Sequence, residues 1–215
     1  MGTVVTVLGA SGRTGRQVAR LLVANGYVVR AGVRNHRRRH AVADLGVPAV
    51  VTDLAVDPDE LVDAFTGSDV VINCAGAADP DPAAVNLIDR DGAVAATRAA
   101  ERAGVRRYVQ LSAMFADAPD QGDRLVRSIL YAKQVSDNVL CRSSLVWTVV
   151  RPATLTDDPG TGRVAAAARL DAGRVPREDV AAVLLGCLTE PRTEHRGFDL
   201  HSGRTPIAKA LATLD

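Results

Sequence analysis

The sequence predicts an α/β protein in which helices cover both faces of a doubly wound parallel sheet. Two observations support this fold class. Short runs rich in Val and Ile alternate with longer Ala-rich stretches of helical character, as expected when parallel strands are joined by helical crossovers. Some of these runs, such as Val70–Ile72, are apolar at every position, which suits a strand that is covered on both sides.

The elements follow one another along the whole chain, so we expect one domain, residues 1–215, with a sheet of about seven strands. The predicted strands are Val4–Gly9, Val28–Val33, Ala49–Thr52, Val70–Cys74, Arg107–Ser112, Trp147–Arg151 and Gly197–His201. The clearest predicted helices are Gly12–Asn25, Ala83–Ala103, Asp123–Arg142, Arg177–Thr189 and Pro206–Leu214.

Charge and composition exclude several classes of function. The formal charge of +1 provides no basic field for nucleic acid or an anionic membrane. No apolar run reaches the roughly 18 residues that cross a bilayer, and the N-terminus enters the first strand without a basic leader. The four His and three Cys residues do not have the spacing of a metal site. We therefore expect a cytoplasmic protein that acts on a small molecule and has no metal.

The turn between the first strand and the first helix is rich in glycine. Glycine lets a ligand approach the backbone closely, and the unpaired N–H groups at a helix start favour an anion. The Gly-x-x-Gly-x-x-Gly spacing is one residue longer between its first two glycines than the commonest dinucleotide fingerprint. We expect the turn to bind the diphosphate of a nucleotide; a structural turn without ligand is the alternative. Its residues are Gly9, Ala10, Ser11, Gly12, Arg13, Thr14 and Gly15.

The end of the second strand is basic at the place where an acidic residue would contact the ribose of NAD. That place holds Arg34, and no acid follows until Asp44. Arginine can bind a 2′-phosphate through charge-assisted hydrogen bonds and stack on adenine. We therefore predict NADP(H) in preference to NAD(H), with Arg34 as the contact and with Arg38 and Arg39 in solvent. Arg13 could reach the same phosphate or only cover the helix end.

Together with further motifs, these features resemble the atypical branch of the short-chain dehydrogenase/reductases. That branch includes NmrA-like proteins and the flavin and biliverdin reductases. The resemblance implies a single-domain Rossmann-like fold and an NAD(P) coenzyme, but it says little about the substrate. Besides the glycine turn, the matching segments are Asp53-Leu54, Asn73–Ala77, Leu111–Ala113, Ala132-Lys133, Trp147–Pro152, Gly160–Val164 and Arg177–Ala181.

The resemblance also implies which residues hold the adenosine half of the coenzyme. Asp53 would accept a hydrogen bond from the adenine amino group, and Leu54 would supply an apolar wall. Ala75, Gly76 and Ala77 have small or no side chains, so a ribose could lie against their backbone. These five residues are therefore predicted to bind the coenzyme.

The nicotinamide half is expected at the ends of the later strands. By the same resemblance, Ser112 would present its hydroxyl to the substrate or the nicotinamide, and Pro152 and Ala153 would line the nicotinamide pocket. The substrate would then lie between two loops, at about 113–128 and 152–176.

Lys133 matches a family lysine that holds the nicotinamide ribose and lowers the pKa of a Tyr one helical turn earlier. In this sequence the position four before Lys133 is Ile129. Tyr131 is only two residues away and faces another side of a helix, so it is a doubtful substitute. We expect Ser112 and Lys133 to act without a Tyr acid; a solvated helix lysine is the alternative reading of Lys133.

The missing Tyr separates the possible functions. Hydride transfer to a flavin, quinone or other conjugated acceptor can take its proton from water, whereas ketone reduction or sugar epimerisation is harder without a protein acid. We therefore predict an NADPH-dependent reductase of a small conjugated acceptor. The alternatives are a non-catalytic NADP(H)-sensing regulator, similar to NmrA and bound to a protein partner, and a nucleotide-sugar epimerase or dehydratase. The sequence leaves the oligomeric state open.

Overall fold

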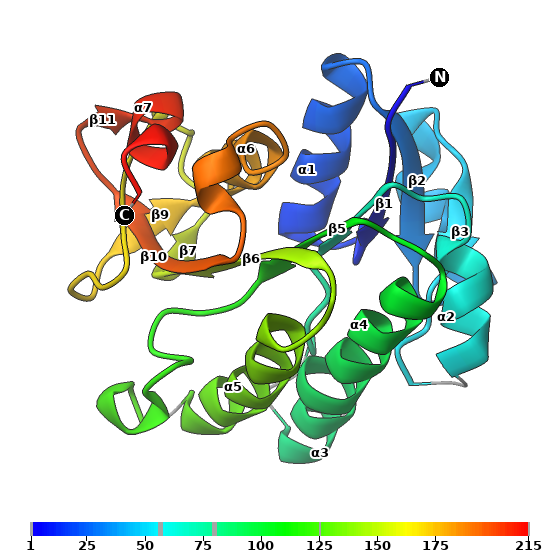
Figure 1. Ribbon diagram of the computed structural model, residues 1–215, viewed down its shortest axis with the longest axis horizontal. Coiled ribbons are helices and arrows are strands. Elements are labelled where there is room, and N and C mark those ends of the chain that lie inside the picture. Colours follow the sequence, from blue (N-terminus) through cyan, green and yellow to red (C-terminus); the bar gives the residue numbers. More distant parts are fainter. Residues whose placement is uncertain (1, 56–57, 79–80, 125, 215) are drawn as a thin grey trace.

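The computed structural model describes residues 2–55, 58–78, 81–124 and 126–214. Within these ranges a nine-stranded sheet runs through the molecule, and helices cover both of its faces (Figure 1). Its strand order is β11-β8-β10-β6-β5-β4-β1-β2-β3. The doubly wound, Rossmann-like α/β fold predicted from the sequence is confirmed.

Seven neighbouring strands of the described sheet are parallel, and they are the seven that the sequence predicts. Each predicted end is within one residue of the observed end. The strands are β1 (Val4–Leu8), β2 (Val28–Val33), β3 (Ala49–Val51), β4 (Val70–Asn73), β5 (Arg107–Leu111), β6 (Val146–Pro152) and β10 (Arg196–Ser202).

The expected total of about seven strands was wrong, because two antiparallel strands extend the sheet beyond β10. They are β8 (Arg163–Ala167) and β11 (Thr205–Pro206). β8 is mostly alanine and β11 has two residues, so neither has the β-branched pattern that marks a strand. The segment 152–176 also contains β7 (Thr154–Thr156) and β9 (Arg174–Pro176), which pair as a separate small sheet.

The helices differ from the prediction mainly on one face of the sheet. The stretch predicted as one helix, Ala83–Ala103, is divided by the π-helical segment η2 (Asn86–Gly92), and α2 (Pro58–Phe65) was not predicted because it is short. The helices of the described ranges are α1 (Arg13–Ala24), α2 (Pro58–Phe65), α3 (Pro82–Val85), α4 (Ala93–Arg102), α5 (Arg127–Cys141), α6 (Arg177–Gly186) and α7 (Ile207–Ala212). The other helical segments are η1 (His36–Leu45), η2 (Asn86–Gly92), η3 (Pro119–Gln121) and η4 (Pro191–Thr193).

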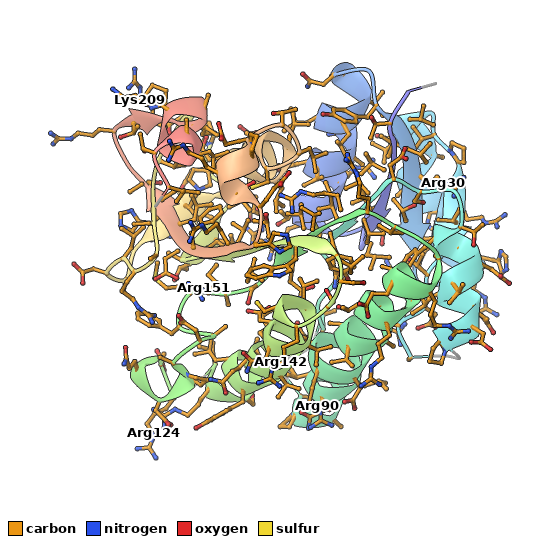
Figure 2. All side chains as sticks on the ribbon, in the orientation of Figure 1. Arg30, Arg90, Arg124, Arg142, Arg151 and Lys209 are labelled. Carbon is orange, nitrogen blue, oxygen red and sulfur yellow. The ribbon has the colours of Figure 1, made fainter. Side chains whose placement is uncertain are left out.

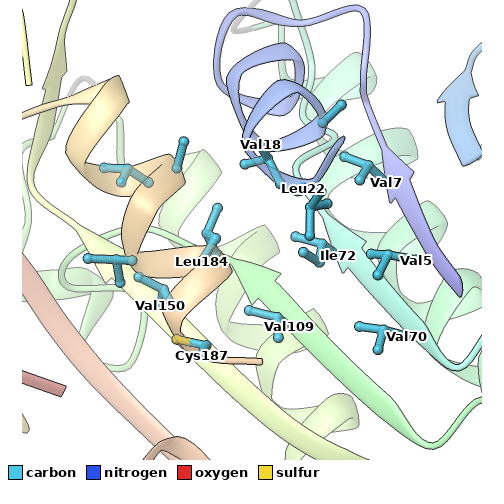
Figure 3. Packing of buried hydrophobic residues seen from close by; sticks show 14 of the residues in the cluster. Val5, Val7, Val18, Leu22, Val70, Ile72, Val109, Val150, Leu184 and Cys187 are labelled. Carbon is cyan, nitrogen blue, oxygen red and sulfur yellow. The ribbon is translucent and has the colours of Figure 1, made fainter. Parts of the chain in front are cut away.

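The core consists of two apolar layers, one on each face of the sheet. On one face α1, α6 and α7 pack on the strands, and on the other face α2, α4 and α5 do so. Charged side chains such as Arg124 and Lys209 lie at the periphery (Figure 2). In Figure 3, Val18 and Leu22 of α1 point at Val7 and Ile72 of the sheet. Their spacing of four places both side chains on the same face of the helix.

The strand order determines where a ligand can lie. β1 is followed along the sheet by β2 and β3 on one side and by β4 and β5 on the other. The chain therefore leaves β1 and β4 in opposite directions at this switch point. The carboxyl ends of these two strands lie side by side at one edge of the sheet. No helix of the described ranges is long and apolar enough to cross a membrane.

Candidate functional site

A cavity of about 450 Å³ lies at this carboxyl edge, where the segments after β1, β2, β3 and β4 meet. Its volume is in the range of pockets that hold small ligands. We call it the edge cavity. Its walls include nine of the residues predicted to bind the coenzyme, namely Gly9, Ser11, Gly12, Arg34, Asp53, Leu54, Ala75, Gly76 and Ala77.

The glycines of the turn have two different roles. Gly9 has a φ of +69°, and a Cβ there would lie 2.9 Å from the backbone of Ala75. A Cβ on Gly15 would lie 2.3 Å from the carbonyl oxygen of Gly9. Both positions must therefore be glycine for the turn to be this tight. Gly12 is exposed at the start of α1 and no side chain caps this helix. The first N–H groups of α1 are therefore left for water or for an anion such as a diphosphate.

The remaining residues of the turn are divided between core and surface. Ala10 and Thr14 are buried and fix the turn against the sheet, whereas Ser11 lines the edge cavity. Arg13 has a side chain that is 71% exposed, and it donates to Asp157 Oδ2 over 2.8 Å. Exposed pairs of this kind contribute about 0–1 kcal/mol. Arg13 therefore contacts the segment after β7 through a weak ion pair with Asp157. A phosphate could take the place of Asp157 in this contact.

Two arginines line the edge cavity beyond β2. Arg34 follows the strand directly, as the sequence predicts, and Arg38 lies four residues further on, in η1. Both side chains are in exposed positions. The sequence did not indicate Arg38, because the prediction placed it in solvent together with Arg39. The signal that could have found it is the run of basic residues 34–40 directly after β2, since the end of this strand lies at the carboxyl edge of the sheet.

Lys133 is held in a fixed position by a carboxylate of η2. Its Nζ lies 3.0 Å from Asp89 Oδ1, and it donates to the carbonyl oxygen of Leu111 over 3.4 Å. Asp89 Oδ2 accepts the N–H of Ala77 over 2.9 Å, which connects the pair to the wall of the edge cavity. The side chains of Lys133 and Asp89 are only 13% and 4% exposed. Lys133 is thus not a solvated surface lysine, and the sequence reasoning missed its partner.

Tyr131 points away from this pair. Its hydroxyl donates to Asp120 Oδ1 over 2.9 Å, and its side chain is exposed. This hydrogen bond to Asp120 raises the pKa of Tyr131 above its ordinary value. Ile129 stands four residues before Lys133. A phenol therefore does not occupy the place next to Lys133 where the family's acid would lie.

Ser112 belongs to a buried polar network under the carboxyl end of β5. Its Oγ donates to Asp137 Oδ2 over 2.5 Å, and Gln110 Nε2 donates to Asp137 Oδ1 over 3.3 Å. Burial raises the pKa of Asp137 from 3.8 to about 6, although the bond from Ser112 and the charge of Lys133 act in the opposite direction. The sequence reasoning missed Asp137. Its spacing of four from Lys133, which puts both on one face of α5, could have indicated it.

The other predicted residues of the nicotinamide half lie at the same edge but outside the edge cavity. Pro152 accepts the N–H of Met114 over 2.9 Å, and Ala153 donates to the carbonyl oxygen of Leu200 over 2.8 Å. Both are buried. Cys74 lines the edge cavity, but burial raises its pKa to about 12, so its thiol is not a nucleophile at neutral pH. In the described residues, no group of three or more His, Cys, Asp or Glu could hold a metal ion.

Comparison with known proteins agrees with this geometry. A family model described as NAD(P)H-binding matches residues 9–191, a range that includes the whole edge cavity. The chain belongs to this NAD(P)H-binding family. It is an atypical short-chain dehydrogenase/reductase, as the motifs suggested. The preference for NADP(H) stays a prediction, and so does the NmrA-like subgroup.

Three relatives of the chain match it over nearly their full length. The uncharacterized sugar epimerase YhfK of Bacillus subtilis is 36% identical over 212 residues, which cover 98% of this chain and 99% of the relative. The structure of a putative NAD-dependent epimerase/dehydratase from Bacillus halodurans has a TM-score of 0.91 at 32% identity, covering 98% and 99% of the two chains. The oxidoreductase ylbE from Lactococcus lactis has a TM-score of 0.86 at 26% identity, covering 97% and 95%.

Proposed function

We propose that this protein is an NADPH-dependent reductase that transfers hydride to a small conjugated acceptor of the flavin or quinone kind. The observation that supports it is the pairing of Lys133 with Asp89 beside the edge cavity, in a site where Ile129 stands in the place of the family's Tyr. Such a site can bind and orient a coenzyme, but it lacks the phenol that protonates a ketone.

In this proposal the edge cavity holds the adenosine half of NADP. Gly12 and the uncapped start of α1 would bind the diphosphate, and Asp53 would face the adenine amino group. Arg34 and Arg38 both line the cavity, and together they would place two positive charges near the 2′-phosphate. NAD has no charge at that position, so the two arginines favour NADP.

The nicotinamide supplies the hydride when the coenzyme is bound. In this proposal Lys133 holds the ribose hydroxyls, because Asp89 and the carbonyl oxygen of Leu111 fix its ammonium group at the carboxyl edge. Pro152, the last residue of β6, and Ala153 after it would form an apolar wall beside the nicotinamide. The protein thus contributes orientation and a dry surface, and the acceptor's own electronic structure makes it easy to reduce.

Two alternatives share the same coenzyme site. The printed names of two relatives refer to epimerases, and an epimerase would have to remove and return hydride at a sugar carbon while a protein group takes up the hydroxyl proton. The position of Ile129 and the contact of Tyr131 with Asp120 speak against that chemistry. A sensor similar to NmrA would bind NADP(H) without turnover, and nothing in the edge cavity opposes it.

The proposed function is tested by following NADPH oxidation at constant enzyme concentration against a panel of a flavin, a quinone, a simple ketone and a nucleotide sugar. We expect oxidation above the rate of the free coenzyme with the flavin or the quinone, and none with the ketone. Tight NADPH binding with no turnover on any acceptor would favour the sensor instead. In a parallel reaction of the nucleotide sugar with NADP⁺, an epimerised sugar without net reduction of the coenzyme would favour the epimerase.

A further inference from the structure

A single carboxylate joins the glycine turn to the segment after β7. Asp157, the residue directly after β7, accepts hydrogen bonds from two arginines. Arg13 Nη1 donates to its Oδ2 over 2.8 Å, and Arg177 Nη1 donates to its Oδ1 over 2.7 Å. Arg13 is the first residue of α1 and Arg177 is the first residue of α6. We call this arrangement the Asp157 bridge. It connects two helix starts with the segment 152–176, where we expect part of the acceptor site.

The two halves of the Asp157 bridge differ in burial. The side chain of Arg177 is 10% exposed, whereas that of Arg13 is 71% exposed. A nearly buried guanidinium that loses its carboxylate is strongly destabilised, so the contact of Asp157 with Arg177 is kept. The contact with Arg13 lies in water, and such a pair shifts an equilibrium by about fivefold at most. The Arg13 half is therefore the one that a competing anion can open.

Arg13 lies next to the proposed position of the diphosphate but is directed elsewhere. Ser11 and Gly12, the two residues before it, line the edge cavity, whereas Arg13 does not. Gly12 is the N-cap of α1, and no side chain caps this helix. An anion bound there would lie one residue from Arg13, and arginine binds phosphate through charge-assisted hydrogen bonds. Asp157 thus holds a guanidinium group that the diphosphate would otherwise bind.

We propose that Asp157 competes with the diphosphate of the coenzyme for Arg13, so that coenzyme binding opens this half of the Asp157 bridge. With the coenzyme bound, Arg13 donates to the diphosphate and Asp157 keeps Arg177. This inference rests on the proposed function, because it requires the coenzyme at the glycine turn. It makes Asp157 a positioning residue that lowers the affinity for the coenzyme. By linkage, any change that weakens the contact between Arg13 and Asp157 strengthens coenzyme binding.

The place of Arg13 in the chain favours the diphosphate over the 2′-phosphate as its partner. Arg13 begins α1, directly after Gly12. The 2′-phosphate is assigned in our proposal to the end of β2, where Arg34 and Arg38 line the edge cavity. The diphosphate is common to NADPH and NADH, whereas the 2′-phosphate belongs to NADPH alone. Competition by Asp157 should therefore affect both coenzymes to the same extent.

The competition is tested by isothermal titration of Asp157→Asn with NADPH and with NADH. Asparagine can still accept from Arg177 through its amide oxygen, but it no longer attracts Arg13 by charge. Both coenzymes should bind about two- to fivefold more tightly than they bind to the wild type. Asp158→Asn is the matched control, because it removes the same charge one residue further along, and its gain in affinity should be clearly smaller. The gain in Asp157→Asn should also shrink as salt is added, since salt screens an exposed ion pair.

A second pair of variants shows whether the effect passes through Arg13. Arg13→Gln should bind both coenzymes about tenfold more weakly, because the diphosphate loses a charged donor. In the double variant Arg13→Gln with Asp157→Asn, the second change should raise the affinity no more than Asp158→Asn does.

Three results would overturn the competition while leaving the proposed function in place: wild-type affinity in Asp157→Asn or in Arg13→Gln, a gain that persists in the double variant, or a gain confined to NADPH. Because Arg13 is exposed, Arg13→Gln decides the matter alone if Asp157→Asn does not fold. A wild type that binds the coenzymes but reduces no acceptor would overturn the proposed function and leave the competition standing. A wild type that binds neither coenzyme would overturn both.

Discussion

The ion pair between Lys133 and Asp89 should make a large contribution to stability, and Asp89→Asn is the variant that measures it. The two side chains are 13% and 4% exposed, and their charged atoms are 3.0 Å apart. Asparagine keeps the size of the side chain and can still accept the N–H of Ala77, but it removes the carboxylate that pairs with the ammonium group of Lys133. Breaking a buried pair in this way costs about 3–5 kcal/mol.

We expect a value near the lower end, about 3 kcal/mol, because the carbonyl oxygen of Leu111 still accepts from Lys133. For a chain of this size that loss lowers Tm by roughly 6–12 °C. Urea unfolding followed by circular dichroism gives the free energy directly. Asp91→Asn is the matched control in the same segment, because its partner Arg90 is 39% exposed and the loss should stay below about 1 kcal/mol.

The double variant Asp89→Asn with Lys133→Met separates the charge from the packing. Replacing both members removes the unpaired ammonium group, so most of the lost stability should return. The reasoning would be refuted if Asp89→Asn unfolded within about 1 kcal/mol of the wild type, or if the double variant were no more stable than Asp89→Asn.

Three further predictions concern the coenzyme and pH. Arg34→Ala should weaken NADPH binding by about 10- to 150-fold, equivalent to a charge-assisted hydrogen bond of roughly 1.5–3 kcal/mol, and leave NADH binding unchanged in calorimetry; Arg39→Ala should alter neither. Gly15→Ala should lower Tm and abolish coenzyme binding, because its Cβ would lie 2.3 Å from the carbonyl oxygen of Gly9. Because burial raises the pKa of Asp137 to about 6, the folded state binds more protons than the unfolded state between pH 4 and 6. Stability should thus fall by roughly 3 kcal/mol as the pH rises through that range, and Asp137→Asn should flatten this part of a urea-unfolding profile.

The parallel strands could be predicted from the sequence because the hydrophobic pattern that marks each strand lies within the strand itself. A run such as Val70–Ile72 is buried on both faces and therefore has to be apolar throughout. The same rule fails for Arg163–Ala167, where an alanine-rich strand is held between β10 and β11 by antiparallel pairing. Local composition contains no information about such a pairing.

The residues of the candidate site also fall into those that the sequence predicts and those that it does not. The glycine turn and Arg34 could be predicted because their positions follow from the end of one strand. Asp89 and Asp137 were missed, because each acquires its role from a partner that is distant in sequence. Asp89, within the π-helical segment, contacts Lys133 of α5, and Asp137 of α5 contacts Ser112 at the end of β5. A sequence pattern reports spacing along one element, whereas these contacts join two.

The central claim is that the edge cavity holds a phosphorylated nicotinamide coenzyme with its diphosphate on the turn at Gly12. Isothermal titration of the wild type and of Gly12→Asp with NADPH and NADH tests it most directly. Aspartate is a favourable residue at a helix N-cap, so the variant should fold. Its carboxylate would occupy and repel the diphosphate position. The account predicts one NADPH site per chain, weaker binding of NADH than of NADPH, and loss of the binding of both coenzymes in Gly12→Asp. Unchanged coenzyme binding in Gly12→Asp, or no heat from either coenzyme with the wild type, would contradict it.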